Sequence, residues 1–289
     1  MQSDVTMRLV LGLIISSAIG VAAFRRASLS RSGAFGAVLI GTPLFGFGGW
    51  IAGVLLMTFF ISSSALSHYK AQSRSKRDAA RFFDKGGRRD LGQALANGGA
   101  AAFCAVAFGL SDSPSAQHAW QAAMLGALAA ATADTWATEL GVLSQHPPVL
   151  ITTLQPATPG RSGAVSGAGL VAACAGATLI AVVFSVLNTL NPAMLTPALG
   201  TFAPSAPIRT AIAVIIGGAA GSVFDSLLGA TVQAQYYNAH LTKPTEKSCD
   251  ENGIPHALIS GWRWMNNDLV NFLASIAGAG ITVLIASIG

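Results

Sequence analysis

The chain has 289 residues, of which 52% are hydrophobic and only 10% are charged. Soluble domains carry about 25% charged residues, so this composition excludes an ordinary soluble globular protein. It also excludes an intrinsically disordered chain, which would have far fewer apolar side chains. The composition instead predicts an all-α, polytopic membrane protein whose apolar segments cross the bilayer as a helical bundle.

Apolar segments between polar breaks predict about eight transmembrane helices, within a range of roughly seven to nine. The second and third segments are short, so this pair forms either two spans in a tight hairpin or a re-entrant pair. The chain shows no internal repeat and no long linker, which predicts a single membrane domain over residues 1–289. The predicted spans are 8–24, 33–48, 50–66, 91–110, 119–141, 165–188, 209–232 and 266–288, and the sizeable loops lie near 67–90, 142–164 and 233–265.

The distribution of basic residues predicts the orientation of these spans. Of the 17 Lys and Arg residues, only Arg8 and Arg209 fall on one side of the eight-span arrangement. The positive-inside rule makes the opposite side cytoplasmic and places both termini outside the cytoplasm. The net charge of +5 is then explained by topology and by contact with anionic lipid, and not by nucleic-acid binding. We expect an integral protein of a bacterial inner or plasma membrane.

Polar side chains gather at the predicted cytoplasmic ends of the helices, where ionisable groups are costly and usually functional. One stripe leaves the third span and another enters the fourth, and each follows helical three- and four-residue steps. Either stripe is equally consistent with a seam of interhelical hydrogen bonds. The stripes are Ser63-Ser67-Lys70 and Asp90-Gln93-Asn97.

The strongest signal is the segment Ala-Asp-Thr-Trp-Ala-Thr-Glu-Leu-Gly at 133–141, which places Asp134 and Glu139 at the end of the fifth span. Two carboxylates without an adjacent base repel each other, and a divalent cation carrying phosphates would offset that cost. On an ideal helix the two side chains lie about 140° apart, so we do not expect both to chelate one ion. One would bind metal and the other would orient a partner. The alternative is a protonated or salt-bridged structural pair.

The loop after this span predicts a phosphate-binding turn. Its Gly-Arg-Ser-Gly sequence offers backbone N–H groups, a hydroxyl and a guanidinium, and it runs into the start of the sixth span, where the helix dipole favours anions. It is not a P-loop, because the required spacing is absent. The residues are Gly160, Arg161, Ser162, Gly163 and Ser166.

Two later spans bring further polar groups to the same predicted membrane face. The seventh span carries small residues, which allow close helix contact, followed by a carboxylate. The eighth span begins with amides that share one helical face. These residues are Gly217, Gly218, Gly221, Asp225, Ser226, Asn267 and Asn271.

Other common site types are not predicted. The five histidines lack metal-ligand spacing and do not pair with the three cysteines, so we expect no transition-metal site. The cysteines suggest no disulfide framework. The sequence also has no Gly-x-Ser-x-Gly elbow and no dinucleotide-binding fingerprint.

Four segments together resemble one family of polytopic membrane proteins, whose best understood member is plant phytyl-phosphate kinase. The segments are 89–98, 133–141, 159–166 and 221–230, and they occur in the family's order over nearly the whole chain. The resemblance implies a membrane kinase that transfers the terminal phosphate of CTP, or of another nucleoside triphosphate, to a prenyl monophosphate such as phytyl or geranylgeranyl phosphate. The family is also distantly similar to dolichol kinase and the CDP-diacylglycerol synthases.

This resemblance, together with the needs of phosphoryl transfer, gives the acidic and basic residues roles. Such a reaction requires positioning and charge neutralisation. Asp134 and Asp225 would hold Mg²⁺ on the donor phosphates, and Glu139 would complete that shell or orient a water. Arg161 would stabilise the transferred group. In this loop the family commonly has Thr or Asn where the chain has Arg161 or Ser162, a departure that bears on donor choice more than on the reaction type.

The remaining predicted residues would bind the acceptor and the nucleotide at a site that faces the cytoplasm. Lys70 and Arg89 would grip the acceptor phosphate, and the prenyl tail would lie between small-residue helix faces that open to lipid. The other predicted substrate- or nucleotide-binding residues are Asp90, Gln93, Asn97, Gly160, Ser162, Gly163, Ser166, Ser226, Asn267 and Asn271.

Two other functions remain open from the sequence. A secondary transporter would use the acids as a proton or cation relay. A cytidylyltransferase would use the same donor and metal but form a CDP-lipid and release pyrophosphate. The oligomeric state is also open, and a homodimer is included among the options.

Overall fold

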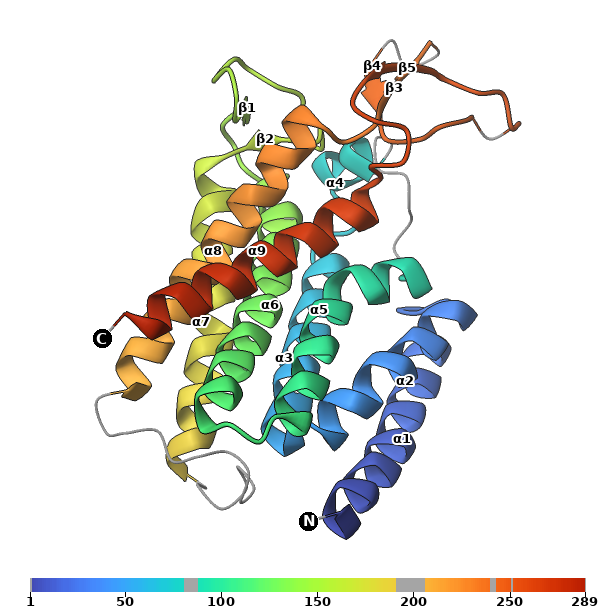
Figure 1. The fold of residues 1–289 in the computed structure, drawn as a ribbon. Coiled ribbons are helices and arrows are strands. Elements are labelled where there is room, and N and C mark those ends of the chain that lie inside the picture. Colours follow the sequence, from blue (N-terminus) through green and yellow to red (C-terminus); the bar gives the residue numbers. More distant parts are fainter. Residues whose placement is uncertain (1, 81–87, 191–205, 240–242, 251, 289) are drawn as a thin grey trace.

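The computed structural model describes residues 2–80, 88–190, 206–239, 243–250 and 252–288. Within these ranges the chain forms nine α-helices and five short strands (Figure 1). The helices are α1 (Gln2–Arg25), α2 (Arg31–Gly46), α3 (Gly49–His68), α4 (Arg74–Ala80), α5 (Leu91–Leu110), α6 (Pro114–Gly141), α7 (Gly167–Leu190), α8 (Ala206–Thr231) and α9 (Asn267–Ser287). The strands are β1 (Val149–Leu150), β2 (Ala164–Val165), β3 (Gln235–Asn238), β4 (Lys243–Thr245) and β5 (Ala257–Ser260).

Helix α6 is the central element of the bundle. It contacts α3, α5, α7, α8 and α9, and every residue from Gln121 to Ala133 is buried. This stretch consists largely of alanine, whose small side chain lets the surrounding helices approach closely. The largest buried side chains around it include Leu44, Leu55 and Phe184. The central position of α6 fixes the place of Asp134, which follows directly after the buried stretch.

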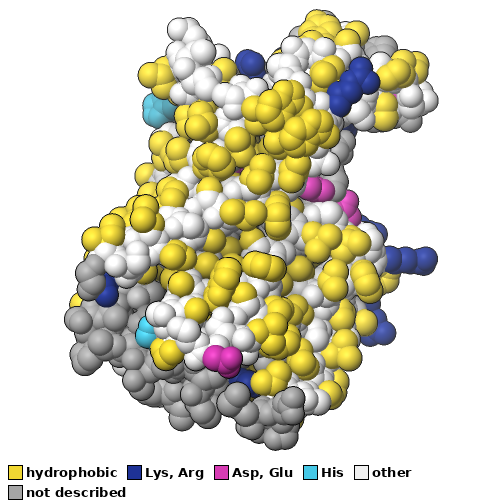
Figure 2. All heavy atoms as spheres, in the orientation of Figure 1, with side chains coloured by type: hydrophobic (Ala, Val, Ile, Leu, Met, Phe, Trp, Pro, Cys, Tyr) yellow, Lys and Arg dark blue, Asp and Glu magenta, His cyan; other side chains and the backbone are white. Residues whose placement is uncertain are grey.

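Within the described ranges, six helices are long and apolar enough to cross a membrane: α1, α3, α5, α7, α8 and α9. The predicted spans 33–48 and 119–141 correspond to α2 and α6, which fall outside this set. Helix α2 has 16 residues, or about 24 Å at 1.5 Å per residue, and the hydrocarbon core is about 30 Å thick. Helix α6 is surrounded by other helices. Its side chains therefore contact protein, whereas the side chains of a helix at the edge of the bundle would contact lipid. Figure 2 shows hydrophobic side chains spread over the outside of the helical body.

Small residues bring α6, α8 and α9 together, as the sequence of the seventh span predicted. A Cβ atom added at Gly221 of α8 would lie 2.6 Å from the Cβ of Ala130 and 3.0 Å from the carbonyl oxygen of Ala274. A Cβ at Gly278 of α9 would likewise lie 2.6 Å from Ala130. These distances are shorter than an ordinary van der Waals contact. The three helices can therefore pack this closely only because glycine, which has no Cβ atom, stands at both positions.

Helix α4 and all five strands lie at one end of the bundle, and both termini lie away from it (Figure 1). We call this the loop end. Strands β1 and β2 pair antiparallel, and β4, β3 and β5 form a second antiparallel sheet in that order. The sequence predicted an all-α fold with loops here. The bundle is confirmed as mostly helical, whereas α4 and the strands were not predicted, because short elements in polar segments have no hydropathy signal.

Side-chain caps define where several helices begin at the loop end. Ser30 accepts a hydrogen bond from the Gly33 N–H at the start of α2, and Asn266 accepts one from the Leu269 N–H at the start of α9. Asp90 forms a complete capping box with Gln93 at the start of α5. The side chain of Asp90 is therefore engaged in holding the helix terminus.

Candidate functional site

A cavity of about 490 Å³ opens at the loop end of the bundle. Its wall is formed by the ends of α3, α5, α6, α7, α8 and α9, by α4, by the segment that carries β1 and β2, and by Gln233 and Glu246. The volume falls within the range of about 300–1,000 Å³ that is typical of small-molecule sites. All sixteen residues predicted for the site line this cavity except Lys70 and Asp90.

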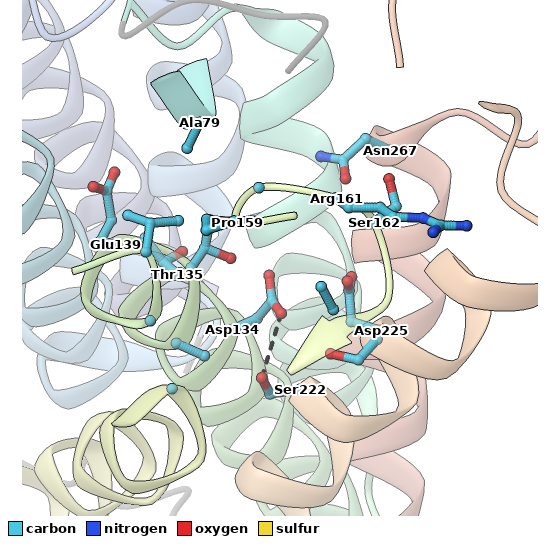
Figure 3. Close-up of a pocket in the computed structure, with 18 of the residues that line it drawn as sticks. Ala79, Asp134, Thr135, Glu139, Pro159, Arg161, Ser162, Ser222, Asp225 and Asn267 are labelled. Carbon is cyan, nitrogen blue, oxygen red and sulfur yellow. Dashed lines mark hydrogen bonds between the residues drawn. The ribbon is translucent and has the colours of Figure 1, made fainter. Parts of the chain in front are cut away.

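Two carboxylates, Asp134 from α6 and Asp225 from α8, lie near each other in the middle of this cavity (Figure 3). Ser222 donates a hydrogen bond of 3.3 Å to Oδ1 of Asp134. Oδ2 of Asp225 is buried and has no hydrogen-bond partner within the described part of the chain. The negative charges of Asp134 and Glu246 both act on Asp225. The centre of the cavity therefore brings carboxylates together, and one carboxylate oxygen of Asp225 has no hydrogen-bond donor among the described residues.

This donor set fits a hard divalent cation that also carries phosphate oxygens. Mg²⁺ typically uses one or two protein carboxylates together with substrate phosphates and waters. In the ranges that the structure describes, no group of three Asp, Glu, His or Cys side chains is arranged to hold a metal ion by itself. Asp134 and Asp225 are thus the pair that would hold the cation, with a phosphorylated ligand completing its shell.

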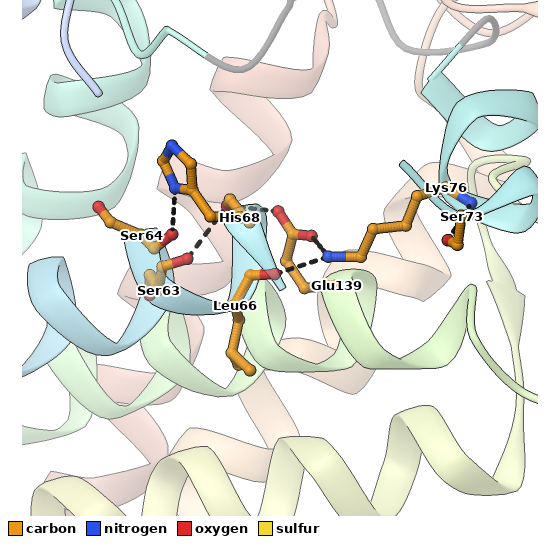
Figure 4. Close-up of polar contacts among 8 residues, drawn as sticks. Ser63, Ser64, Leu66, His68, Ser73, Lys76 and Glu139 are labelled. Atoms are coloured by element: carbon orange, nitrogen blue, oxygen red, sulfur yellow. Dashed lines mark hydrogen bonds and ion pairs between the residues drawn. The ribbon is translucent and has the colours of Figure 1, made fainter. Parts of the chain in front are cut away.

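Glu139 lies in another part of the cavity and has partners of its own (Figure 4). Its Oε2 lies 2.6 Å from Nζ of Lys76, and its Oε1 accepts a hydrogen bond of 2.5 Å from Ser67. Lys76 also donates to the carbonyl oxygen of Leu66. These contacts tie α6 to α3 and α4 through the Glu139 carboxylate, whereas its predicted role at a metal ion stays a prediction.

Arg89 precedes α5 and lies at the edge of the cavity. Its backbone N–H and carbonyl are hydrogen-bonded to Ser28 and Ser30, and its guanidinium lies against the rings of Phe59 and Phe60 at 5.7 and 5.9 Å. Burial lowers the pKa of this guanidinium from its ordinary value, and the nearby Glu139 carboxylate raises it. An arginine stays charged in proteins, so this is a fixed cation held at the rim.

The predicted phosphate-binding turn lines the cavity. Gly160 and Gly163 have φ angles of +86° and +78°, in the left-handed region that favours glycine. The Ser162 hydroxyl donates a hydrogen bond of 2.8 Å to Glu246 Oε1. Nε of Arg161 is buried, with no hydrogen-bond partner among the residues described here. In Figure 3 Arg161 lies on the α9 side of the cavity, opposite Glu139.

The loop that carries this turn runs into α7, the predicted sixth span, after the two-residue strand β2. Strand β2 separates the turn from α7, and the Ser166 hydroxyl accepts a hydrogen bond from the Gly169 N–H, so Ser166 caps the helix. The backbone and side chains of residues 160–163 therefore line the cavity from a loop, and they are not part of the first helical turn of α7.

The polar stripe on α3 is interrupted. The helix ends at His68, and Lys70 adopts a φ of +49° beyond it, with an exposed side chain. Its Nζ lies 5.4 Å from the centre of the Tyr69 ring. Ser67 reaches Glu139, whereas Ser63 is fully buried.

Four charged residues of the cavity wall were not among the predicted site residues: Lys76, Arg77, Glu246 and Asp268. Lys76 lies in α4, and Glu246 follows β4 in the segment over the cavity. Lys76 and Glu246 lie in segments that are rich in basic or polar residues. The sequence around them therefore does not predict that their side chains line the cavity.

A family model described as "Integral membrane protein DUF92" matches residues 14–279. The chain belongs to this family. Among the relatives of this DUF92 protein, Protein PGR of Arabidopsis thaliana is 32% identical over 98% of the chain and 97% of its own length. An uncharacterized membrane protein of Methanocaldococcus jannaschii is 28% identical over 98% of the chain and 96% of its own length. An uncharacterized membrane protein of Synechocystis is 25% identical over 81% of the chain and 74% of its own length. No solved structure gives a significant match.

Proposed function

We propose that this DUF92 protein is a membrane kinase that transfers the terminal phosphate of a nucleoside triphosphate, with CTP favoured, to a prenyl monophosphate. The observation that carries the proposal is the placement of Asp134 and Asp225 in one cavity with the Gly160–Gly163 turn. Carboxylates suited to a cation lie beside a turn and an arginine suited to phosphate, and these are the parts that phosphoryl transfer needs.

The residues divide the work of the reaction. Asp134 and Asp225 would hold Mg²⁺, which when bound neutralises charge on the donor phosphates. Arg161 and the backbone of the turn would bind the transferred phosphoryl group, and Arg89 would bind the acceptor phosphate. An oxygen of the acceptor phosphate forms the new bond to the terminal phosphorus, and the bond to the nucleoside diphosphate breaks. Because that oxygen is already ionised, no side chain has to remove a proton.

The amide side chains at the cavity wall complete the proposed site. Gln93 and Asn97 lie beside Arg89, and Asn267 and Asn271 lie at the start of α9. Amides offer donors and acceptors without adding charge. We assign Asn267 and Asn271 to the nucleotide, together with Ser226 of α8.

The membrane arrangement follows from the same proposal. Counting α2 and α6 with the six clear spans gives eight, with both termini outside the cytoplasm and the loop end within it. The cavity then faces the cytoplasm, where nucleoside triphosphates are available. A secondary transporter is less well supported, because alternating access requires a site near the bilayer midplane and this cavity lies at one end of the helices.

The proposal is tested by assaying the detergent-solubilised protein with Mg²⁺, labelled CTP or ATP, and prenyl monophosphates of several chain lengths. Prenyl diphosphate together with CDP or ADP would support it. A CDP-lipid with released pyrophosphate would identify a cytidylyltransferase instead. A folded protein that forms neither product would overturn the enzymatic proposal and favour transport.

A further inference from the structure

A second cavity, of about 70 Å³, lies next to the first one, among α1, α2, α3 and α5. Its wall is almost entirely apolar and includes Ile40, Leu56 and Met57. Three residues line both cavities: Arg89, Gln93 and Asn97. A polar chamber and an apolar one thus meet at a boundary made of one guanidinium and two amides.

Arg89 is suited to hold an anion at this boundary. Its Nη1 atom is buried, and the described residues offer it no hydrogen-bond partner. Its guanidinium lies against Phe59 and Phe60, and both of these rings line the apolar cavity. A buried cationic group with an unsatisfied donor is costly, and a bound anion at this point would remove that cost.

Close packing of α2 and α5 keeps the apolar cavity narrow. A Cβ atom added at Gly36 would lie 2.7 Å from the Cβ of Ala94, and one added at Gly98 would lie 2.6 Å from Cγ2 of Ile40. The space between these helices is therefore slender, and it favours one hydrocarbon chain over the two chains of a diacyl lipid.

We infer that the apolar cavity binds the hydrocarbon chain of a single-chain lipid phosphate, whose phosphate lies at Arg89. This inference rests on the proposed function, because it gives the binding site of the prenyl monophosphate that accepts the phosphate in that reaction. The charge of Arg89 matches the phosphate, the apolar wall matches the chain, and the shared boundary places the phosphate in the chamber that holds Asp134 and Asp225. A cavity of about 70 Å³ takes only the part of the hydrocarbon chain next to the phosphate.

The test measures binding without turnover, in detergent and without nucleotide, by native mass spectrometry or thermophoresis. The probes are geranylgeranyl monophosphate, geranylgeraniol and a diacyl phosphatidate. The variant Ala37→Leu places three more carbon atoms in the apolar cavity, because Ala37 lines it. The control, Ala175→Leu, makes the same change at an exposed position of α7. A second variant, Arg89→Ala, removes the cation.

We expect the unmodified protein to bind the single-chain phosphate at least tenfold more tightly than the alcohol or the phosphatidate. Ala37→Leu should weaken that binding at least tenfold, with Ala175→Leu unchanged. Arg89→Ala should weaken binding of the phosphate while leaving that of the alcohol within about twofold. Equal effects of the two leucine variants, or no selectivity for the phosphate, would overturn the inference. The kinase proposal would survive that result if the protein still forms prenyl diphosphate.

Discussion

Nζ of Lys76 lies 2.6 Å from Oε2 of Glu139, and this contact fixes the short helix α4 over the end of the central helix α6 (Figure 4). The exposed fraction is 8% for the Lys76 side chain and 22% for that of Glu139. Ala79, on the same short helix, packs against Gly160 of the phosphate-binding turn. Helix α4 is thus connected to the end of α6 through the Lys76–Glu139 ion pair and to the phosphate-binding turn through Ala79.

Replacing Lys76 by Met should destabilise the protein, because Glu139 would be left partly buried without its cation. We expect a loss of about 3 kcal/mol in the free energy of unfolding, the lower end for a broken buried pair. The measurement is unfolding in detergent. The control is Arg74→Ala, which breaks the exposed pair with Asp78, 3.6 Å apart, and should cost less than about 0.5 kcal/mol. Equal effects of the two variants would show that the Lys76 pair does not hold α4 in place.

Neutralising either central carboxylate should stop turnover with little effect on folding. For Asp134→Asn and Asp225→Asn we expect at least about a 100-fold loss of rate, the scale seen when one electrostatic contact of a transition state is removed. The rate should also depend less steeply on the Mg²⁺ concentration. Asp112→Asn, at an exposed position between α5 and α6, is the matched control. If Asp134→Asn retained activity, Asp134 would not belong to the site.

The placement of Asp134 and Asp225 at one end of the bundle could be predicted from the sequence, because they lie at the C-terminal ends of the fifth and seventh predicted spans, which run in the same direction. The same reasoning brought Arg89 and Asn267 to the cavity. It failed for Lys76, which is 63 residues from its partner Glu139, and for Glu246, which is 84 residues from Ser162. Both lie in polar segments whose fold depends on contacts with the finished bundle and not on local hydropathy. Lys70 was misplaced because helical spacing was extended past the end of α3.

Glu246 should hold the phosphate-binding turn in place, because its Oε1 accepts hydrogen bonds from Ser162 at 2.8 Å and from Gln233 at 2.9 Å. Glu246→Ala removes this acceptor, so we expect the KM for nucleotide to rise about tenfold, the cost of roughly one charge-assisted hydrogen bond. Glu246→Gln keeps an acceptor oxygen and should restore most of the affinity. The opposite result, a lower KM for Glu246→Ala, would show that its charge repels the phosphates more than its hydrogen bonds order the turn.

Gly163 gives the most direct test of the turn itself. Its φ is +78°, and an added Cβ would lie 2.5 Å from the Cβ and 2.6 Å from the Cα of Ala230 in α8. Gly163→Ala must therefore shift the turn away from α8, in addition to a backbone cost of about 1–2 kcal/mol for the left-handed conformation. We expect at least a tenfold loss of activity in the kinase assay. Gly167→Ala, four residues away, meets no atom within 4 Å and should remain within twofold of the unmodified protein. An active Gly163→Ala variant would show that catalysis does not require this position of the turn.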